Sequence, residues 1–456
     1  MPCYTFILAL AAVVACGCRA ADGAPLSRPV APAASRETHR AEPSGTVTLA
    51  EALALALARN PELAVFPYEL RAADARVLQA GLLPNPELGV EVEEFGGAGA
   101  RRDFEAAETT VQLGQPIELG GKRDKRTRVA ALDKELVQWD YKSARLDVLR
   151  EVARAFAAVL AAQERLALSA RLLELSQQAQ TAVTQRVQAG KDSPVDGLKA
   201  DVALAASRIE RQKAQQALTT ARHTLAAAWG SRAPAFEKVS GDFYAVAEPR
   251  PVAEVTAALD ENPDVARWQT EEDKRRAALH LEKARAVPDI TVGGGVRRFE
   301  EGDDTALVFG LGVPLPLFNR NQGGIREAVA NLAKTRPQAK AVQIRTRAAL
   351  TEATSALAAA HAEVTTLRTD ILPKAQQAFE AAQQGYQQGK FDYLYVLDAQ
   401  RTFFGTQAQY IDSVEAYHKA QADVQRLIGE PALASDKNIS SGSLPEPLSQ
   451  ETLHEK

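Results

Sequence analysis

Hydrophobic and polar residues alternate with a period of two in two parts of this chain, residues 86–117 and 288–318. In the first part, Leu88, Val90 and Val92 fall on one side of an extended chain, and Gly89, Glu91 and Glu93 fall on the other. In the second part, the apolar side consists of Leu307, Phe309, Leu311 and Val313. This alternation predicts half-exposed β-strands, two in each part. Each part is therefore expected to form a β-hairpin.

The segments after the hairpins follow a helical period instead. Residues 122–187 repeat apolar positions every three or four residues and contain no glycine or proline. At 1.5 Å per residue, a helix of this length spans about 100 Å, which is too long for one globular core. Glycine and then proline end this helix and begin a return helix, so 122–229 is expected to be a long helical hairpin. Residues 322–429 repeat the plan, with the first of their two helices expected to be long and to reach Gln388.

The chain is therefore an internal repeat. Asn60-Pro61-Glu62 returns as Asn262-Pro263-Asp264, and Gly190-Lys191 returns as Gly389-Lys390, about 200 residues later in each case. We expect a first repeat over 47–250 and a second over 251–430. The first begins with helix over Val47–Gly81, capped by Thr48 with Glu51 and divided into two helices at Asn60-Pro61-Glu62. It ends in a connector, 230–250, with a short strand at Phe243–Val246. Residues 19–46 are expected to be a flexible tether, and 431–456 a disordered tail.

The first 18 residues read as an export signal. Val13-Val14-Ala15-Cys16 is typical of a lipoprotein signal, in which Cys16 becomes the acylated first residue. A simple secretory signal cleaved near Ala20 or Ala21 is the alternative. The three cysteines lie within this region and the histidines are isolated in sequence, so no disulfide framework, metal site or cofactor is expected in the body of the chain.

Charge and composition add few constraints. The formal net charge is −4, and the basic residues are scattered along helices, which gives no reason to expect nucleic acid binding. No nucleophile–base pair or phosphate-binding loop indicates an enzyme. The hairpins could cap a soluble coiled-coil scaffold or adaptor. They could also be barrel strands with a lipid-facing apolar side and a polar lumen. Lipid does not tolerate open sheet edges, and four strands cannot close, so three chains would supply twelve.

The duplicated plan, with PNPEL, QPIELGGKR, GVPLPLFNRNQG and GKFDYLYVLDAQRTFF, resembles the outer-membrane factor family, the TolC-like channels of tripartite efflux systems. Within that family it is most similar to the CzcC/CusC-like branch associated with heavy-metal pumps. The resemblance covers about 47–430 and implies an α+β membrane protein. That protein would be a homotrimer with a twelve-stranded barrel in the outer membrane and a long antiparallel α-helical barrel in the periplasm. It would conduct substrate passively from an inner-membrane RND pump and a periplasmic adaptor.

The resemblance also implies a gate at the periplasmic tips of the helical hairpins. Asp196 and Asp398 match acidic gate positions, where three-fold symmetry would make carboxylate rings. Tyr395 stands where some members carry a second aspartate, and Phe391 where some carry a basic residue. The turns at Gly190, Lys191, Gly389 and Lys390 would contact the adaptor. For both aspartates, a carboxylate that complements a helix N-terminus is the alternative. The resemblance implies heavy-metal cations such as cobalt, zinc, cadmium or copper as cargo. Drugs or other small molecules are the alternative, since no residue pattern selects between them.

Overall fold

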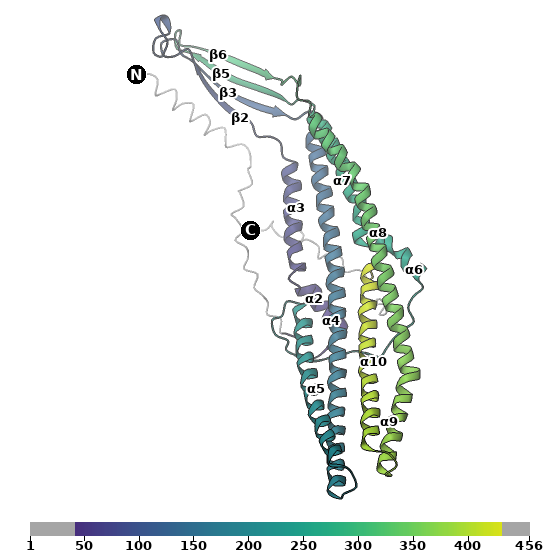
Figure 1. Ribbon diagram of the computed structural model, residues 1–456. Helices are drawn as coiled ribbons and strands as arrows, with labels where there is room; N and C mark the ends of the chain where they lie inside the picture. The colour runs from purple at the N-terminus through teal and green to yellow at the C-terminus, as the bar shows by residue number, and fades with distance from the viewer. Residues whose placement is uncertain (1–41, 431–456) are drawn as a thin grey trace, which may run out of the picture. The chain divides into compact units, whose positions relative to one another are not determined.

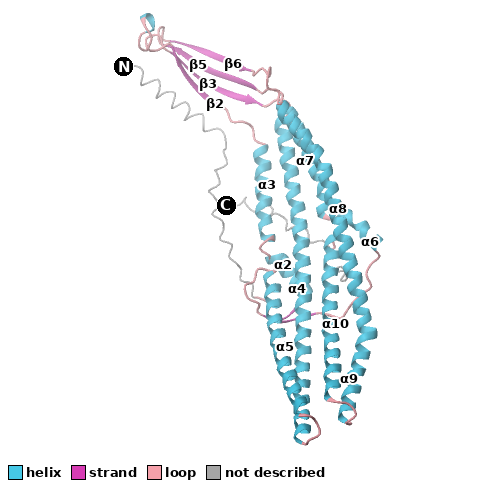
Figure 2. Ribbon diagram, viewed as in Figure 1, coloured by secondary structure: helices cyan, strands magenta, loops and turns pink. Residues whose placement is uncertain are grey.

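The computed structural model describes residues 42–430, which from Pro43 onward belong to one compact unit. The signal region with Cys16, most of the tether and the tail at 431–456 lie outside the described residues. Helices and strands alternate along the chain, but strands β2, β3, β5 and β6 lie together in space, apart from the helices (Figure 2). Among residues 42–430, no helix is both long and apolar enough to span a membrane.

The larger sheet has four antiparallel strands in the order β2-β3-β5-β6. They are β2 (Glu87–Glu93), β3 (Glu108–Ile117), β5 (Ile290–Phe299) and β6 (Asp304–Gly312). β3 pairs with β5, so one strand from each repeat joins the two hairpins into one sheet. The hairpin expected over 288–318 is shorter than predicted, because its last strand ends at Gly312. Pro314 and Pro316 lack the N–H groups that a strand ladder needs.

The strand register sorts the side chains of this sheet onto two faces. Val90, Val111, Val296 and Leu307 stand in one row across all four strands. On this apolar face, Leu307 is 90 % exposed and Phe309 76 % exposed. The opposite face carries Glu91, Thr110 and Arg297 in a matching row. The predicted alternation is therefore confirmed, and the described protein leaves the apolar face uncovered.

The helices form neighbouring columns around α4, which contacts α2, α3, α5, α7 and α10 (Figure 1). The first half contains α2 (Leu49–Arg59), α3 (Phe66–Ala80), α4 (Lys122–Gln188) and α5 (Pro194–Ala227). The second half contains α6 (Val252–Ala257), α7 (Pro263–Arg285), α8 (Gln322–Thr366), α9 (Leu372–Gln387) and α10 (Tyr393–Leu427). The unbroken helix expected after the first hairpin is confirmed as α4.

The repeated Asn-Pro motif joins helices end to end. Asn262, which is fully buried, accepts a hydrogen bond from the Asp264 N–H at the start of α7 at 2.8 Å, and its amide donates to the Leu427 carbonyl at the end of α10 at 2.9 Å. Asn60 does the same, accepting from the Glu62 N–H and donating to the Ala228 carbonyl, both at 2.8 Å. Each asparagine thus satisfies unpaired groups at two helix ends, as such ends require.

The start of the first repeat and the connector differ from the predictions. Residues Gly45–Thr48 form strand β1, which pairs in parallel with β4 (Phe236–Ser240). The prediction that the tether reaches residue 46 and that a helix starts at Val47 was therefore wrong. The short strand expected at Phe243–Val246 was also wrong, because the connector's strand is β4. Val47, Phe236 and Val239 are buried together in the core beside α4. The capping box of Thr48 and Glu51 is confirmed, and it starts α2 directly after β1.

The long helix expected to reach Gln388 is present, but it is not a regular α-helix throughout. A π-helical turn, Leu367–Ile371, separates α8 from α9. Pro373 follows this turn and cannot donate the hydrogen bond that a regular helix would require of it. A single wide turn before a proline absorbs this mismatch without ending the helix.

Candidate functional site

The two helical hairpins end in turns with the same backbone. Gly190 (φ +70°) and Gly389 (φ +73°) adopt the left-handed conformation that glycine permits without strain. The Lys191 N–H donates to the Arg186 carbonyl at 2.9 Å, and the Lys390 N–H donates to the Gly385 carbonyl at 2.8 Å. These bonds close each helix with the same C-terminal motif. The structure therefore places the four predicted turn residues at equivalent positions of the two tips.

A cluster of three side chains, Arg186, Asp192 and Tyr386, joins the two tips, and we call it the latch. The Asp192 carboxylate accepts hydrogen bonds from Arg186 Nε at 2.9 Å and from the Tyr386 hydroxyl. The Arg186 guanidinium also lies 4.6 Å from the centre of the Tyr386 ring, within reach of a cation–π contact. Arg186 and Asp192 belong to the first hairpin and Tyr386 to the second. The latch therefore links the two hairpins through one carboxylate.

The latch changes the acidity of its members. The hydrogen bond from Arg186 is the main reason that the pKa of Asp192 lies below its ordinary value of 3.8, and the Tyr386 hydroxyl acts in the same direction. Burial, together with the hydrogen bond to Asp192, raises the pKa of Tyr386. At neutral pH the cluster therefore consists of a carboxylate, a guanidinium and a neutral phenol, which is the combination that charge-assisted hydrogen bonds need.

Asp196 lies in the first turn of α5, after the Ser193 cap, and forms an ion pair with Lys199 at 3.2 Å. It also faces the second hairpin. Burial raises the pKa of Tyr393, at the start of α10, to about 12, and the charge of Asp196 contributes to this rise. The structure therefore places Asp196 at a helix N-terminus and near Tyr393 of the second hairpin, and its assignment to a gate stays a prediction.

Asp398, Tyr395 and Phe391 lie on the outside of the second tip. Asp398 is exposed, and no side chain among residues 42–430 forms a hydrogen bond or ion pair with it. Tyr395 is 62 % exposed, and its ring lies 5.7 Å from that of Phe391. The Phe391 ring packs so closely on Gly385 that a Cβ atom there would lie 2.1 Å from it. One chain alone therefore does not bring Asp398 to Asp196.

The sequence analysis did not predict the latch, although the two tips visibly differ in sequence at two of its positions. When the two tips are aligned on Gly190 and Gly389, Arg186 and Asp192 correspond to Gly385 and Phe391. These two positions are in contact in both tips, as an ion pair in one and as a ring on a glycine in the other. No sequence pattern could supply Tyr386 as the third member, because it reaches the cluster from the other hairpin.

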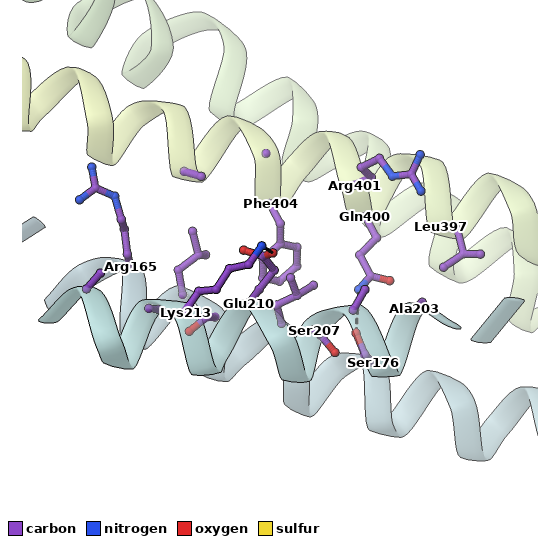
Figure 3. A pocket seen from close by; sticks show the side chains of 18 residues that line it. Arg165, Ser176, Ala203, Ser207, Glu210, Lys213, Leu397, Gln400, Arg401 and Phe404 are labelled. Carbon is purple, nitrogen blue, oxygen red and sulfur yellow. Dashed lines mark hydrogen bonds and ion pairs between the residues drawn. The ribbon is translucent and has the colours of Figure 1, made fainter. Parts of the chain in front are cut away.

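A groove of about 560 Å³ lies between α4, α5 and α10, behind the tips (Figure 3). Small side chains line much of it, including Ser169, Ala203, Ala206, Ser207 and Ala408. The amide of Gln400 points across it to Ser176, with Nε2 and Oγ 3.5 Å apart. Within residues 42–430, no group of three histidine, cysteine or acidic side chains is placed to hold a metal ion. The tips, rather than a ligand cluster, are the candidate site.

Comparison with known proteins identifies the family. The chain matches the outer membrane efflux protein family over residues 52–231 and 255–430. The chain belongs to this family. It is 36 % identical over 389 residues to the cobalt-zinc-cadmium resistance protein CzcC of Cupriavidus metallidurans, covering 85 % of this chain and 91 % of CzcC. It is 28 % identical to the nickel-cobalt-cadmium resistance protein NccC of Alcaligenes xylosoxydans xylosoxydans, covering 69 % and 73 % of the two chains.

Solved structures of the family share the fold. A crystal structure of CusC, from work on its folding and transmembrane channel formation, superposes with a TM-score of 0.72 at 17 % identity, covering 86 % of this chain and 96 % of CusC. A membrane protein from Pseudomonas aeruginosa superposes with a TM-score of 0.70 at 21 % identity, covering 85 % and 92 %. The resemblance read from the sequence motifs, including its leaning to the CzcC/CusC-like branch, is thereby confirmed. The chain is an outer membrane efflux protein, from a family of transport proteins rather than enzymes.

Proposed function

We propose that this protein is the outer-membrane channel of a tripartite RND-type efflux system. Three copies would close one transmembrane β-barrel of twelve strands and one α-helical barrel in the periplasm. The channel would passively conduct heavy-metal cations such as cobalt, zinc, cadmium or copper, delivered by an inner-membrane pump and a periplasmic adaptor. Membership of the efflux family supports the channel, and the names of the relatives CzcC and NccC support the cargo.

The observation that carries the proposal is the unfinished sheet. β2 and β6 are edge strands, and the sheet has an uncovered apolar face beside a polar one. An open edge next to an exposed apolar face is unstable in water and forbidden in lipid. Pairing β6 of one copy with β2 of the next removes every edge, and the apolar face then meets the acyl chains.

We propose that the tips form the gate of this channel. The latch would hold the two hairpins of each copy together in the closed state. Asp196 and Asp398 would add carboxylates near the pore, with Tyr395 and Phe391 narrowing it by their rings. The turns at Gly190, Lys191, Gly389 and Lys390 would contact the adaptor, because they are the outermost backbone of the tips. Acylated Cys16 would add a lipid anchor to the barrel.

Membrane fractionation and channel recording test the proposal. The full chain should fractionate with the outer membrane, run as a trimer in mild detergent and conduct ions in a planar bilayer. Recovery as a soluble periplasmic monomer would instead support a scaffold or adaptor. For the cargo, a deletion strain should lose tolerance to cobalt, zinc, cadmium or copper and keep its tolerance to drugs. The opposite pattern would identify a drug channel and refute the metal assignment.

A further inference from the structure

The polar face of the larger sheet is divided into rows of different size and charge. The row farthest from the helices contains Glu93 on β2, Glu108 on β3, Phe299 on β5 and Asp304 on β6. The next row contains Glu91, Thr110, Arg297 and Ala306. Nearer the helices, the same face carries Gly114, Gly293 and Gly310 in one row, beside Glu87 of β2. Most of the long charged side chains therefore gather at the far end, and three of the four positions in the near row have no side chain.

Arg297 on β5 links side chains of β2 and β3 at this far end of the sheet. Its guanidinium donates to Glu108 Oε2 at 2.9 Å and to Thr110 Oγ1 at 2.8 Å, and it lies 3.2 Å from Glu93 Oε2. Thr110, covered in this way, is only 2 % exposed. Glu91 stands in the same row and has no ion-pair or hydrogen-bond partner among the described residues. The arrangement pairs two carboxylates with one guanidinium and leaves further carboxylates unpaired.

The exposure of the strands shows which face lies inside the curve of the sheet. On β5 and β6, the residues of the polar face are mostly less exposed than their neighbours on the apolar face, which reach 90 % at Leu307. A curled sheet shields its concave face, so the polar face is the inner one. In a closed barrel its side chains would point into the lumen. The far rows would then narrow the lumen and the glycine row would leave it wide.

We propose that Glu91, Glu93, Glu108 and Arg297, here called the charged belt, form an outer constriction that makes the lumen prefer cations over anions. The inference rests on the proposed function, since three copies must surround one lumen. The carboxylates on the inner face are Glu87, Glu91, Glu93, Glu108 and Asp304, and they outnumber the guanidinium of Arg297. Rings of carboxylates favour cations. Arg297 limits this preference by neutralising its two partners, and it is therefore the residue that tunes selectivity.

Reversal potentials test the charged belt directly. The purified full chain is recorded in planar bilayers under a gradient of potassium chloride, with Arg297→Gln, Glu91→Gln and the matched control Arg298→Gln. Arg298 is the next residue along β5, lies in a row of the opposite face and pairs with Glu300 at 3.1 Å. At about 0.1 M salt, we expect Arg297→Gln to raise the ratio of potassium to chloride permeability by roughly twofold or more. Glu91→Gln should lower this ratio, and Arg298→Gln should leave it unchanged.

The outcomes separate this inference from the proposed function. A wild-type protein that forms no channels overturns the proposed function itself. Channels that conduct but keep one permeability ratio in the Arg297 and Glu91 variants overturn the charged belt alone. An equal shift in the Arg298 variant would overturn it too, because that would show a general effect of charge. If Arg297→Gln does not assemble, Glu91→Gln still decides, since it removes a charge without breaking an ion pair.

Discussion

Replacing Tyr386 by phenylalanine should weaken the closed state of the channel. The substitution removes the hydroxyl that bonds to Asp192 and leaves the buried ring, which is 8 % exposed in all, in place. A hydrogen bond to a charged group contributes about 1.5–3 kcal/mol. The Asp192 side chain is only 9 % exposed, which favours the upper part of that range. The equilibrium between closed and open tips should then shift by about 10- to 150-fold in each copy, toward the upper part of that range.

Single-channel recording gives the test, with the open probability as the readout. Tyr393→Phe is the matched control. Tyr393 is buried in the same hydrophobic cluster as Tyr386, and the centres of their rings are 5.7 Å apart. Its hydroxyl forms no hydrogen bond among residues 42–430, so its loss should leave the open probability near that of the wild type. Equal open probabilities for the Tyr386 and Tyr393 variants would refute the reasoning, and so would a Tyr386 variant that stays closed.

Three further predictions follow from the same structure. The latch should open in acid, because the pKa of Asp192 is lowered in the folded protein. The Asp192 carboxylate therefore stabilises the latch fully at pH values above its ordinary pKa of 3.8. This stabilisation is lost as the pH falls through the lowered pKa. Open probability should therefore stay constant from neutral pH to about 5 and rise only below 4, and a rise near pH 6 would point to another group. Asn262→Ala should lower the free energy of unfolding by about 2–4 kcal/mol, because it removes a cap and leaves buried carbonyls unpaired; thermal unfolding measures this against exposed Asn319→Ala, and equal losses would contradict it. Phe309→Arg should reduce outer-membrane insertion, at a cost of about 2–4 kcal/mol near the bilayer midplane, whereas Val308→Arg on the inner face should insert better; equal insertion into vesicles would argue against the lipid assignment.

The regular elements could be predicted because each imposes its period on the sequence. A strand with one apolar face must alternate, and this located β2, β3, β5 and β6. The 67 residues of α4 could be read as one helix because neither glycine nor proline interrupts them. The small sheet could not be read in this way. β1 has four residues and β4 five, and their pairing joins chain segments that are distant in sequence. Short strands of this kind depend on tertiary contacts that leave no periodic signal.

The site was predictable only as far as its backbone. Gly190 and Gly389 mark turns that require a positive φ, and both turns lie where the sequence places them. The side-chain contacts at the tips were harder to predict. Asp192 reads locally as a helix-capping residue, whereas its carboxylate in fact binds Arg186 and Tyr386. Which aspartate reaches the other hairpin depends on how the two hairpins pack against each other. That packing has no counterpart in the local sequence.

The duplication explains why the two tips can share a backbone and still act differently. Arg186 and Asp192 of the first tip correspond to Gly385 and Phe391 of the second, and each pair is in contact. The first pair is polar, so Asp192 can accept a hydrogen bond from the Tyr386 hydroxyl of the other hairpin and can exchange this bond for one with water. The second pair is apolar, so it stabilises its own turn. Tyr386, one residue after Gly385, extends from this rigid turn to the polar one. The proposed gate needs one fixed side and one exchangeable contact, and divergence at two positions of a repeated turn would be sufficient to supply both.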